Sequence, residues 1–173
     1  MGVIGIILNN LRNMKRAKKF RAMTNEQLLA MDDGDLYDAV ACVCEDAVYE
    51  ITEPGHSRER INAHVLLKFE MEVNNGGLCQ FFVNSSRACA PYVTEALAAI
   101  GAWETKALFE GFVSDNGIDL QDLSSFKIAS IGEYEAQTKR YDFDAFDDRF
   151  YQDHRFHQLL MAYLRENLEQ IIR

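Results

Sequence analysis

Two dense groups of aspartates are the side chains of this sequence that could carry a chemical function. Each group places four carboxylates within seven residues. The first group is Asp32, Asp33, Asp35 and Asp38, and the second is Asp142, Asp144, Asp147 and Asp148. A carboxylate at the start of a helix bonds free backbone N–H groups and offsets the helix dipole. That role accounts for one or two aspartates in each group, so four exceed what a helix start requires.

The spacing within each group also permits recognition of a basic partner. Side chains on neighbouring helical turns lie ~5–6 Å apart, and the phosphates of DNA repeat every ~3.4 Å along each strand. A row of carboxylates on a helix can therefore approximate a row of phosphates. Two interpretations stay open, namely helix capping with ordinary solubility and a partner-binding surface.

Signatures of enzymes and of metal sites are not found in the sequence. It contains no Gly-x-Ser-x-Gly elbow, no phosphate-binding glycine loop and no His-Glu-x-x-His pattern. His154 and His157 stand three residues apart beside Asp153, but two histidines are too few ligands for a metal site. We therefore predict a protein that is not an enzyme and that has no metal and no cofactor.

A third feature is a polar and aromatic motif around a double glycine. Its members are Asn75, Gly76, Gly77, Gln80, Phe81, Phe82, Asn84 and Ser85. The two glycines predict a turn, because glycine reaches positive φ at little steric cost. Gln80 and Asn84 are one helical turn apart, so their amides share one side of a helix. Either the amides bond the open ends of the preceding helix and loop, or they form a recognition surface.

The motif resembles a bacterial family of DNA-mimic protein C-terminal domains. The similarity continues through Glu95, Leu97 and Gly101, and more weakly through the Asp147-Asp148-x-Phe150-Tyr151 pattern, so that it covers about two thirds of the chain. The resemblance implies an acidic protein that competes with DNA for a DNA-binding protein. It also implies that residues 24–173 form one acidic, DNA-mimic-like domain.

Charge is distributed unevenly along the chain. The formal net charge is −9, but residues 1–23 contain six basic side chains and no acidic one, which leaves −15 for residues 24–173. The basic residues are Arg12, Lys15, Arg16, Lys18, Lys19 and Arg21. A body of that charge repels nucleic acid and attracts basic surfaces. We therefore predict no direct binding of nucleic acid by the body.

Residues 1–23 are predicted to form a basic amphipathic helix or arm, with apolar residues at helical spacing from Ile4 to Met14. This segment could pack on the body or a partner chain, lie on a membrane surface, or bind nucleic acid. Its apolar run from Val3 to Leu8 is too short to span a bilayer, which takes about 20 residues. With four cysteines that form no CxxC pattern and no cleavable signal peptide, we expect reduced thiols, a cytoplasmic location and no stable membrane anchoring.

Helical periodicity continues through the body. A capping box at Thr24 predicts a helix from 25 to about 31, and residues 32–35 are predicted to interrupt the helical pattern. The other predicted helices cover residues 36–51, 57–74, 80–84, 91–100, 103–113 and 160–171, with one or two more within 119–141. No segment alternates with a period of two. The prediction is an all-α, single compact domain of about seven to nine helices.

Two functions remain open at this point. The first, implied by the resemblance, is a mimic that occupies the DNA-binding surface of a transcription factor or other DNA-binding protein. The alternative is an interaction or immunity-type module that holds another basic protein through the glycine motif. Paired DNA half-sites lie one helical turn apart, ~34 Å, so a two-fold mimic would suit a dimeric helix-turn-helix regulator. We therefore expect a homodimer.

Overall fold

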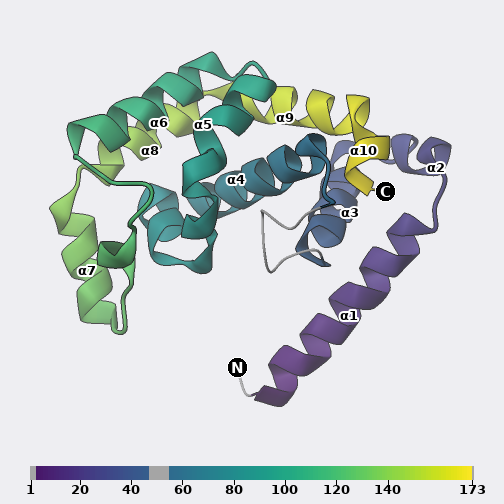
Figure 1. Ribbon diagram of the computed structural model, residues 1–173, viewed down its shortest axis with the longest axis horizontal. Coiled ribbons are helices and arrows are strands. Elements are labelled where there is room, and N and C mark those ends of the chain that lie inside the picture. The colour runs from purple at the N-terminus through teal and green to yellow at the C-terminus, as the bar shows by residue number, and fades with distance from the viewer. Residues whose placement is uncertain (1–2, 47–54, 173) are drawn as a thin grey trace. The chain divides into compact units, whose positions relative to one another are not determined.

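The computed structural model describes the backbone of residues 3–46 and 55–172, and the side chains of residues 12–44 and 55–172. Within these ranges the protein is all-α, with ten α-helices and two short 3-10 helices (Figure 1). Helices α2 and α10 have five residues each. The eight longer helices agree with the predicted seven to nine, so the fold class is confirmed.

The chain forms two compact units, residues 1–64 with 161–173, and residues 65–160. The first unit contains α1 (Val3–Arg21), α2 (Asn25–Leu29), α3 (Asp33–Asp46) and α10 (Leu168–Ile172). The second contains η1 (Ser85–Cys89), α5 (Ala90–Ala99), α6 (Trp103–Asp115), η2 (Ser124–Phe126), α7 (Ile131–Arg140) and α8 (Phe143–Gln152). Helices α4 (Arg58–Val83) and α9 (His154–Glu166) contribute residues to both units.

Side-chain caps start the helices of the first unit. The predicted capping box of α2 is present, since Thr24 Oγ1 accepts from Gln27 N at 3.2 Å and Gln27 Oε1 accepts from Thr24 N at 2.9 Å. At the next helix, Asp32 Oδ1 accepts from Asp35 N at 2.8 Å. Residues 33–35 therefore begin α3, and the prediction that residues 32–35 interrupt the helical pattern holds only for Asp32, in the short gap after α2. Residues 47–51 of the predicted helix 36–51 lie outside the described residues.

Helix α1 packs on α3. Ala17 is fully buried, as are Ala39, Val40 and Val43 of α3. Two bonds join the helices, because Cys42 Sγ donates to Asn13 O at 3.4 Å and Arg21 donates to Val43 O at 3.3 Å. The described part of α1 thus packs on its own chain.

The C-terminal segment forms two helices where one was predicted. Helix α9 ends at Glu166, and α10 follows from Leu168. At the junction, Tyr163 O accepts from both the backbone N–H and the side-chain amide of Asn167, at 3.0 and 2.9 Å. The buried Arg60 donates to Val43 O at 2.9 Å and to Ile171 O at 3.2 Å, which joins α3, α4 and α10.

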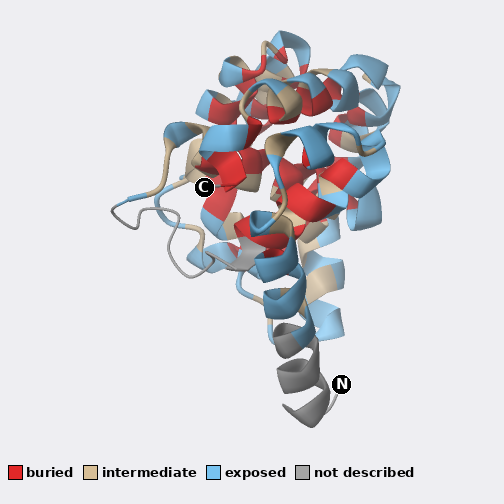
Figure 2. Ribbon diagram, turned by 90° about the vertical axis from the view of Figure 1, so that its right-hand side faces the viewer, coloured by how far each residue is buried: buried red, intermediate tan, exposed pale blue. Residues whose placement is uncertain are grey.

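An aromatic core holds the second unit together, and it forms part of the buried interior shown in red in Figure 2. The ring of Phe69 meets the rings of Phe81, Phe109 and Phe150 edge to face at 5.3, 5.7 and 5.6 Å between centroids. Phe82 stacks on Phe126 at 4.7 Å. The contact explains residues 119–141, in which η2 places Phe126 in the core and α7, which buries no residue, follows as a separate helix.

Candidate functional site

The glycine motif breaks α4 at Gly76 and Gly77, as predicted. Both residues have non-helical dihedral angles, and Gly77 adopts φ 75° and ψ 178°. A helix therefore ends near Asn75 and a second one starts at Leu78. A Cβ atom on Gly77 would overlap the carboxylate of Asp147. Both the positive φ and the close approach of Asp147 therefore require glycine at this position.

Two side chains of α8 bond the free backbone groups on either side of this break. Asp147 Oδ1 accepts from Leu78 N at 2.8 Å, which caps the second part of α4. Tyr151 Oη donates to Val73 O at 2.7 Å, which satisfies a carbonyl at the end of the first part. Asp147 and Tyr151 are four residues apart, so both lie on the side of α8 that meets α4.

The environment of Asp147 is unusual for an aspartate on a helix. Burial raises the pKa of the Asp147 carboxyl, and the hydrogen bond from Leu78 N opposes that rise. The carboxylates of Asp144 and Asp148 raise the pKa further. Asp144 and Asp148 therefore both lie close enough to Asp147 to repel its charge.

A third polar contact organises the segment after the break. The carboxylate of Glu72 accepts from Gln80 Nε2 at 2.7 Å, from Asn84 Nδ2 at 2.9 Å and from Ser86 Oγ at 3.1 Å. Gln80 and Asn84 do share one side of the helix, as predicted. Their partner, however, is the carboxylate of Glu72. The amides therefore do not bond the open backbone ends of the preceding helix, as the first of the two interpretations expects.

Removal of these amides should destabilise the protein unequally. Gln80→Ala should lower the free energy of unfolding by about 1–3 kcal/mol, because it deprives the half-buried Glu72 carboxylate of a donor. Asn84→Ala should cost less, since Asn84 is exposed and water can replace its amide. Urea unfolding followed by circular dichroism measures both changes. Asn75→Ala, at an exposed position without a bond to Glu72, is the control, and equal losses in all three variants would contradict this assignment.

The remaining motif residues divide by exposure. Phe81 and Phe82 are fully buried in the aromatic core, whereas Asn75 and Ser85 are exposed. Sequence reasoning missed Glu72, Ser86 and Tyr151 as partners of the motif. Tyr151 could have been found, because it lies with Asp147 in the second part of the family pattern at helical spacing.

The first aspartate group lies in the first unit, and most of its members have a partner. Asp32 caps α3, Asp33 pairs with Arg165 at 2.6 Å, and Asp38 lies 3.8 Å from Arg16. Asp35 is exposed and makes no side-chain bond or ion pair within the described residues. One carboxylate of this group is thus available to a partner without loss of an internal contact.

The second aspartate group lies in the second unit with the glycine motif. Asp142 caps α8 by accepting from Ala145 N at 3.2 Å, and Asp147 bonds Leu78. Asp144 and Asp148 are exposed and have no bonded partner in the part of the chain that the structure describes. These two lie four residues apart, on the side of α8 opposite the buried Phe143, Phe146 and Phe150.

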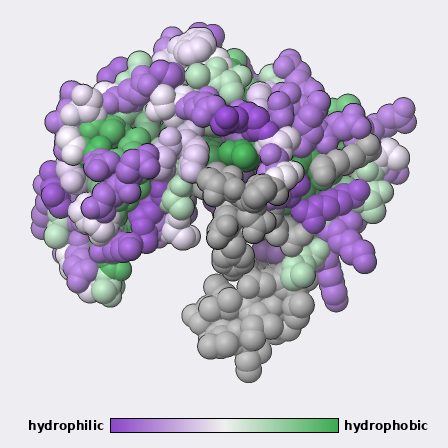
Figure 3. All heavy atoms as spheres, viewed as in Figure 1, coloured by the Kyte–Doolittle hydropathy of each residue, from purple (hydrophilic) through white to green (hydrophobic). Residues whose placement is uncertain are grey.

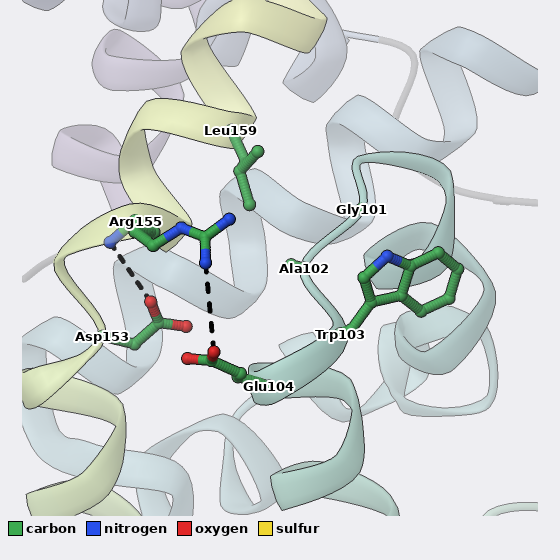
Figure 4. Close-up of a pocket in the computed structure, with 7 residues that line it drawn as sticks. All are labelled: Gly101, Ala102, Trp103, Glu104, Asp153, Arg155 and Leu159. Carbon is green, nitrogen blue, oxygen red and sulfur yellow. Dashed lines mark hydrogen bonds and ion pairs between the residues drawn. The ribbon is translucent and has the colours of Figure 1, made fainter.

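Two shallow pockets lie between α6 and the corner where α8 meets α9. The smaller one, a cavity of about 60 Å³, is shown in Figure 4, where Arg155 reaches Glu104 at 3.9 Å and the indole of Trp103 points away from this pair. The larger one, about 400 Å³, shares Glu104 and Asp153 with it. Asp153 accepts from Thr105 Oγ1 at 2.6 Å. Neither lining contains a histidine or a cysteine, so neither pocket offers a pair of nucleophile and base.

Histidines and cysteines elsewhere form no reactive cluster among the described residues, where no three metal-binding side chains come together. His157 Nδ1 lies 2.9 Å from Oε1 of the buried Glu70, and His154 is exposed. The four cysteines are free and buried. Burial raises the pKa of Cys79 to about 11 and that of Cys89 to about 12, so both thiols stay protonated near neutral pH.

Hydrophilic side chains cover most of the face seen in Figure 3, and hydrophobic areas are small. Residues 65–160 contain 15 acidic and 8 basic side chains, a net charge of −7. None of the described helices combines the length and the apolar character that crossing a membrane requires.

Comparison with known proteins identifies the family. No match to the chain was found among curated proteins or among solved structures. The model of the DMP19-like proteins, relatives of DNA mimic protein 19, matches residues 56–167, which include the glycine motif and the second aspartate group. The matched range is more than half of the chain, and it confirms the resemblance drawn from the motif. This chain therefore belongs to the DMP19-like protein family.

Proposed function

We propose that this protein occupies the DNA-binding surface of a transcription factor or another DNA-binding protein in the bacterial cytoplasm. Its family is one of DNA-mimic proteins. The observation that carries the proposal is the pair of exposed carboxylates on α8, Asp144 and Asp148, which bond no other described residue. They are the members of the second aspartate group that bond no backbone N–H group within the described residues, and Asp148 also lies beyond the first turn of α8.

The carboxylates of α8 repel one another, and the resulting loss of stability favours a role in binding. Like charges one turn apart on a helix destabilise it by about 0.2–0.5 kcal/mol. Asp144 and Asp148 are one turn apart, and both act on the half-buried Asp147. The dipole of α8 stabilises Asp144 in the first turn, but Asp148 lies beyond that turn, so its charge adds repulsion without this benefit. A basic partner would relieve the repulsion.

The bonds of Asp147 and Tyr151 to α4 give the carboxylates a fixed position. Because α8 is bonded on both sides of the α4 break, Asp144 and Asp148 are presented on a helix that is held at two points. Preorganised charges bind with less loss of conformational freedom than charges on a loop. We further propose that the protein acts as a homodimer, because two such surfaces could address the paired half-sites of a dimeric helix-turn-helix regulator.

The experiment compares two pairs of neutralised aspartates. In Asp144→Asn/Asp148→Asn, the affinity for a DNA-binding protein captured from the native host should fall at least about tenfold, because charge pairs at an interface are lost. The free energy of unfolding should not fall. The matched control is Asp142→Ala/Asp147→Ala, which removes the same charge but also two caps, and which should lower stability by about 1–3 kcal/mol.

Competition with DNA decides between the two functions. The captured protein is purified, and its own operator duplex is added to the complex at a salt concentration at which this protein alone does not bind the duplex. Displacement of this protein by the duplex, with affinity that weakens steeply as salt rises, is the expected result. If the captured protein holds its DNA and this protein at once, mimicry is excluded. The alternative, a module that binds a basic protein at another surface, then takes its place.

A further inference from the structure

Helix α1 carries a row of cations, most of which form no ion pair within the described residues. Arg12, Lys15, Arg16 and Lys19 follow the spacing i, i+3, i+4 and i+7, which places them on one side of a helix. All four are exposed. Ala17, on the other side of α1, is fully buried against the first unit. The basic stripe, as we call these four residues, therefore faces solvent.

The internal contacts of α1 explain only part of this charge. Cations in the last turn of a helix offset its dipole, and Lys18, Lys19 and Arg21 occupy that turn. Arg12, Lys15 and Arg16 lie outside it. Arg16 lies 3.8 Å from Asp38, with both side chains well exposed, and its guanidinium lies over the ring of Phe20. Within the described residues, Arg12 and Lys15 make no ion pair.

We propose that the basic stripe of α1 binds the phosphate backbone of double-stranded DNA without regard to sequence. From Arg12 to Lys19 the stripe spans eight residues, whose seven steps cover about 10 Å of helix axis. Duplex DNA carries one negative charge per ~1.7 Å of its axis, so several phosphates lie within reach of the four cations. An α-helix also fits the major groove, which is ~12 Å wide. The proposal is independent of the mimic surface on α8, because the two involve different residues and opposite charges.

Two other negatively charged partners, a membrane surface and an acidic protein, fit α1 less well than DNA does. A helix on a membrane surface buries its apolar side among the lipids, but the side of α1 that holds Ala17 is packed on α3. The net charge of −15 on residues 24–173 would repel an acidic protein as well as DNA. An acidic protein, however, has a lower and less regular charge density than DNA, so it would attract the basic stripe less strongly. Charge complementarity is therefore greatest for DNA.

The test uses the full chain and a fluorescent random-sequence duplex of about 30 base pairs at about 50 mM salt. Fluorescence anisotropy should detect binding that weakens with salt, with a slope of log K against log salt of about −3 to −4 for four phosphate contacts. Binding should weaken at least about tenfold in the stripe variant, which combines Arg12→Gln, Lys15→Gln, Arg16→Gln and Lys19→Gln. Helicity measured by circular dichroism should not change, because all four side chains are exposed.

The control removes four exposed cations from the second unit, Lys127, Lys139, Arg149 and Arg155, each changed to Gln. It has the same net charge as the stripe variant and should keep the parental affinity. Absence of DNA binding, or an equal loss in both variants, would overturn the proposal. So would binding of the parent to vesicles of anionic lipid that is tighter than its binding to the duplex.

Discussion

Replacement of Phe69 by alanine should lower the free energy of unfolding by about 3–5 kcal/mol, the largest loss that we expect from a single substitution. Phe69 is fully buried, and five other phenylalanine rings surround it edge to face. Truncation removes buried apolar surface and leaves a cavity that rings from several helices cannot fill at once. Such edge-to-face contacts add about 0.5–1.5 kcal/mol per pair beyond burial. Guanidinium unfolding followed by circular dichroism measures the loss.

Ile131→Ala provides the control for this substitution. Ile131 is the most exposed of the large hydrophobic side chains described, with 81% of its surface accessible. Its truncation should change the free energy of unfolding by no more than about 0.5 kcal/mol. A loss below about 1 kcal/mol for Phe69→Ala would mean that the aromatic core does not hold the second unit together.

Gly77→Ala should lower the free energy of unfolding by about 2–5 kcal/mol. A non-glycine residue at positive φ costs of order 1–3 kcal/mol, and the new Cβ would displace the Asp147 carboxylate. The buried N–H of Leu78 would then lose its acceptor, at a further cost of about 1–3 kcal/mol. The same unfolding experiment measures the loss. Gly111→Ala, inside α6 with no atom near the added methyl, should instead stabilise by about 0.5–1 kcal/mol.

A double-mutant cycle separates the two causes of the Gly77→Ala effect. In an Asp147→Ala background the steric overlap and the Leu78 bond are already gone, so Gly77→Ala should cost only the backbone strain. The two substitutions should therefore be less than additive by about 1–3 kcal/mol. Additive losses would show that Asp147 does not cap the second part of α4.

Local patterns in the sequence predicted the features that depend on neighbouring residues. The capping box at Thr24, the break at Gly76 and Gly77, and the shared side of Gln80 and Asn84 all involve residues within one or two turns. Steric limits on φ and the repeat of the helix determine such features directly. The all-α class follows for the same reason.

The contacts that position the candidate site join distant parts of the chain, and no local rule reaches them. Asp147 and Leu78 are 69 residues apart, and Arg165 and Asp33 are 132 apart. Counting aspartates at a helix start could show that four were too many for capping. It could not show that Asp33 has an arginine partner, that Asp147 caps another helix, or that Asp144 and Asp148 have no partner among the described residues. Those assignments depend on which helices pack together.

The bonds from Asp147 and Tyr151 across the α4 break have a consequence for genetics. A random screen for loss of partner binding would recover many substitutions in the glycine motif, at Gly77, Gln80 or Glu72. These residues support α8 or the segment after the break, so their variants would be scarce or poorly folded in the cell. Substitutions at Asp144 or Asp148 would be rarer in such a screen, and they would leave the amount of folded protein unchanged. Sorting the recovered variants by protein abundance would therefore distinguish residues that hold α8 in place from residues that contact the partner.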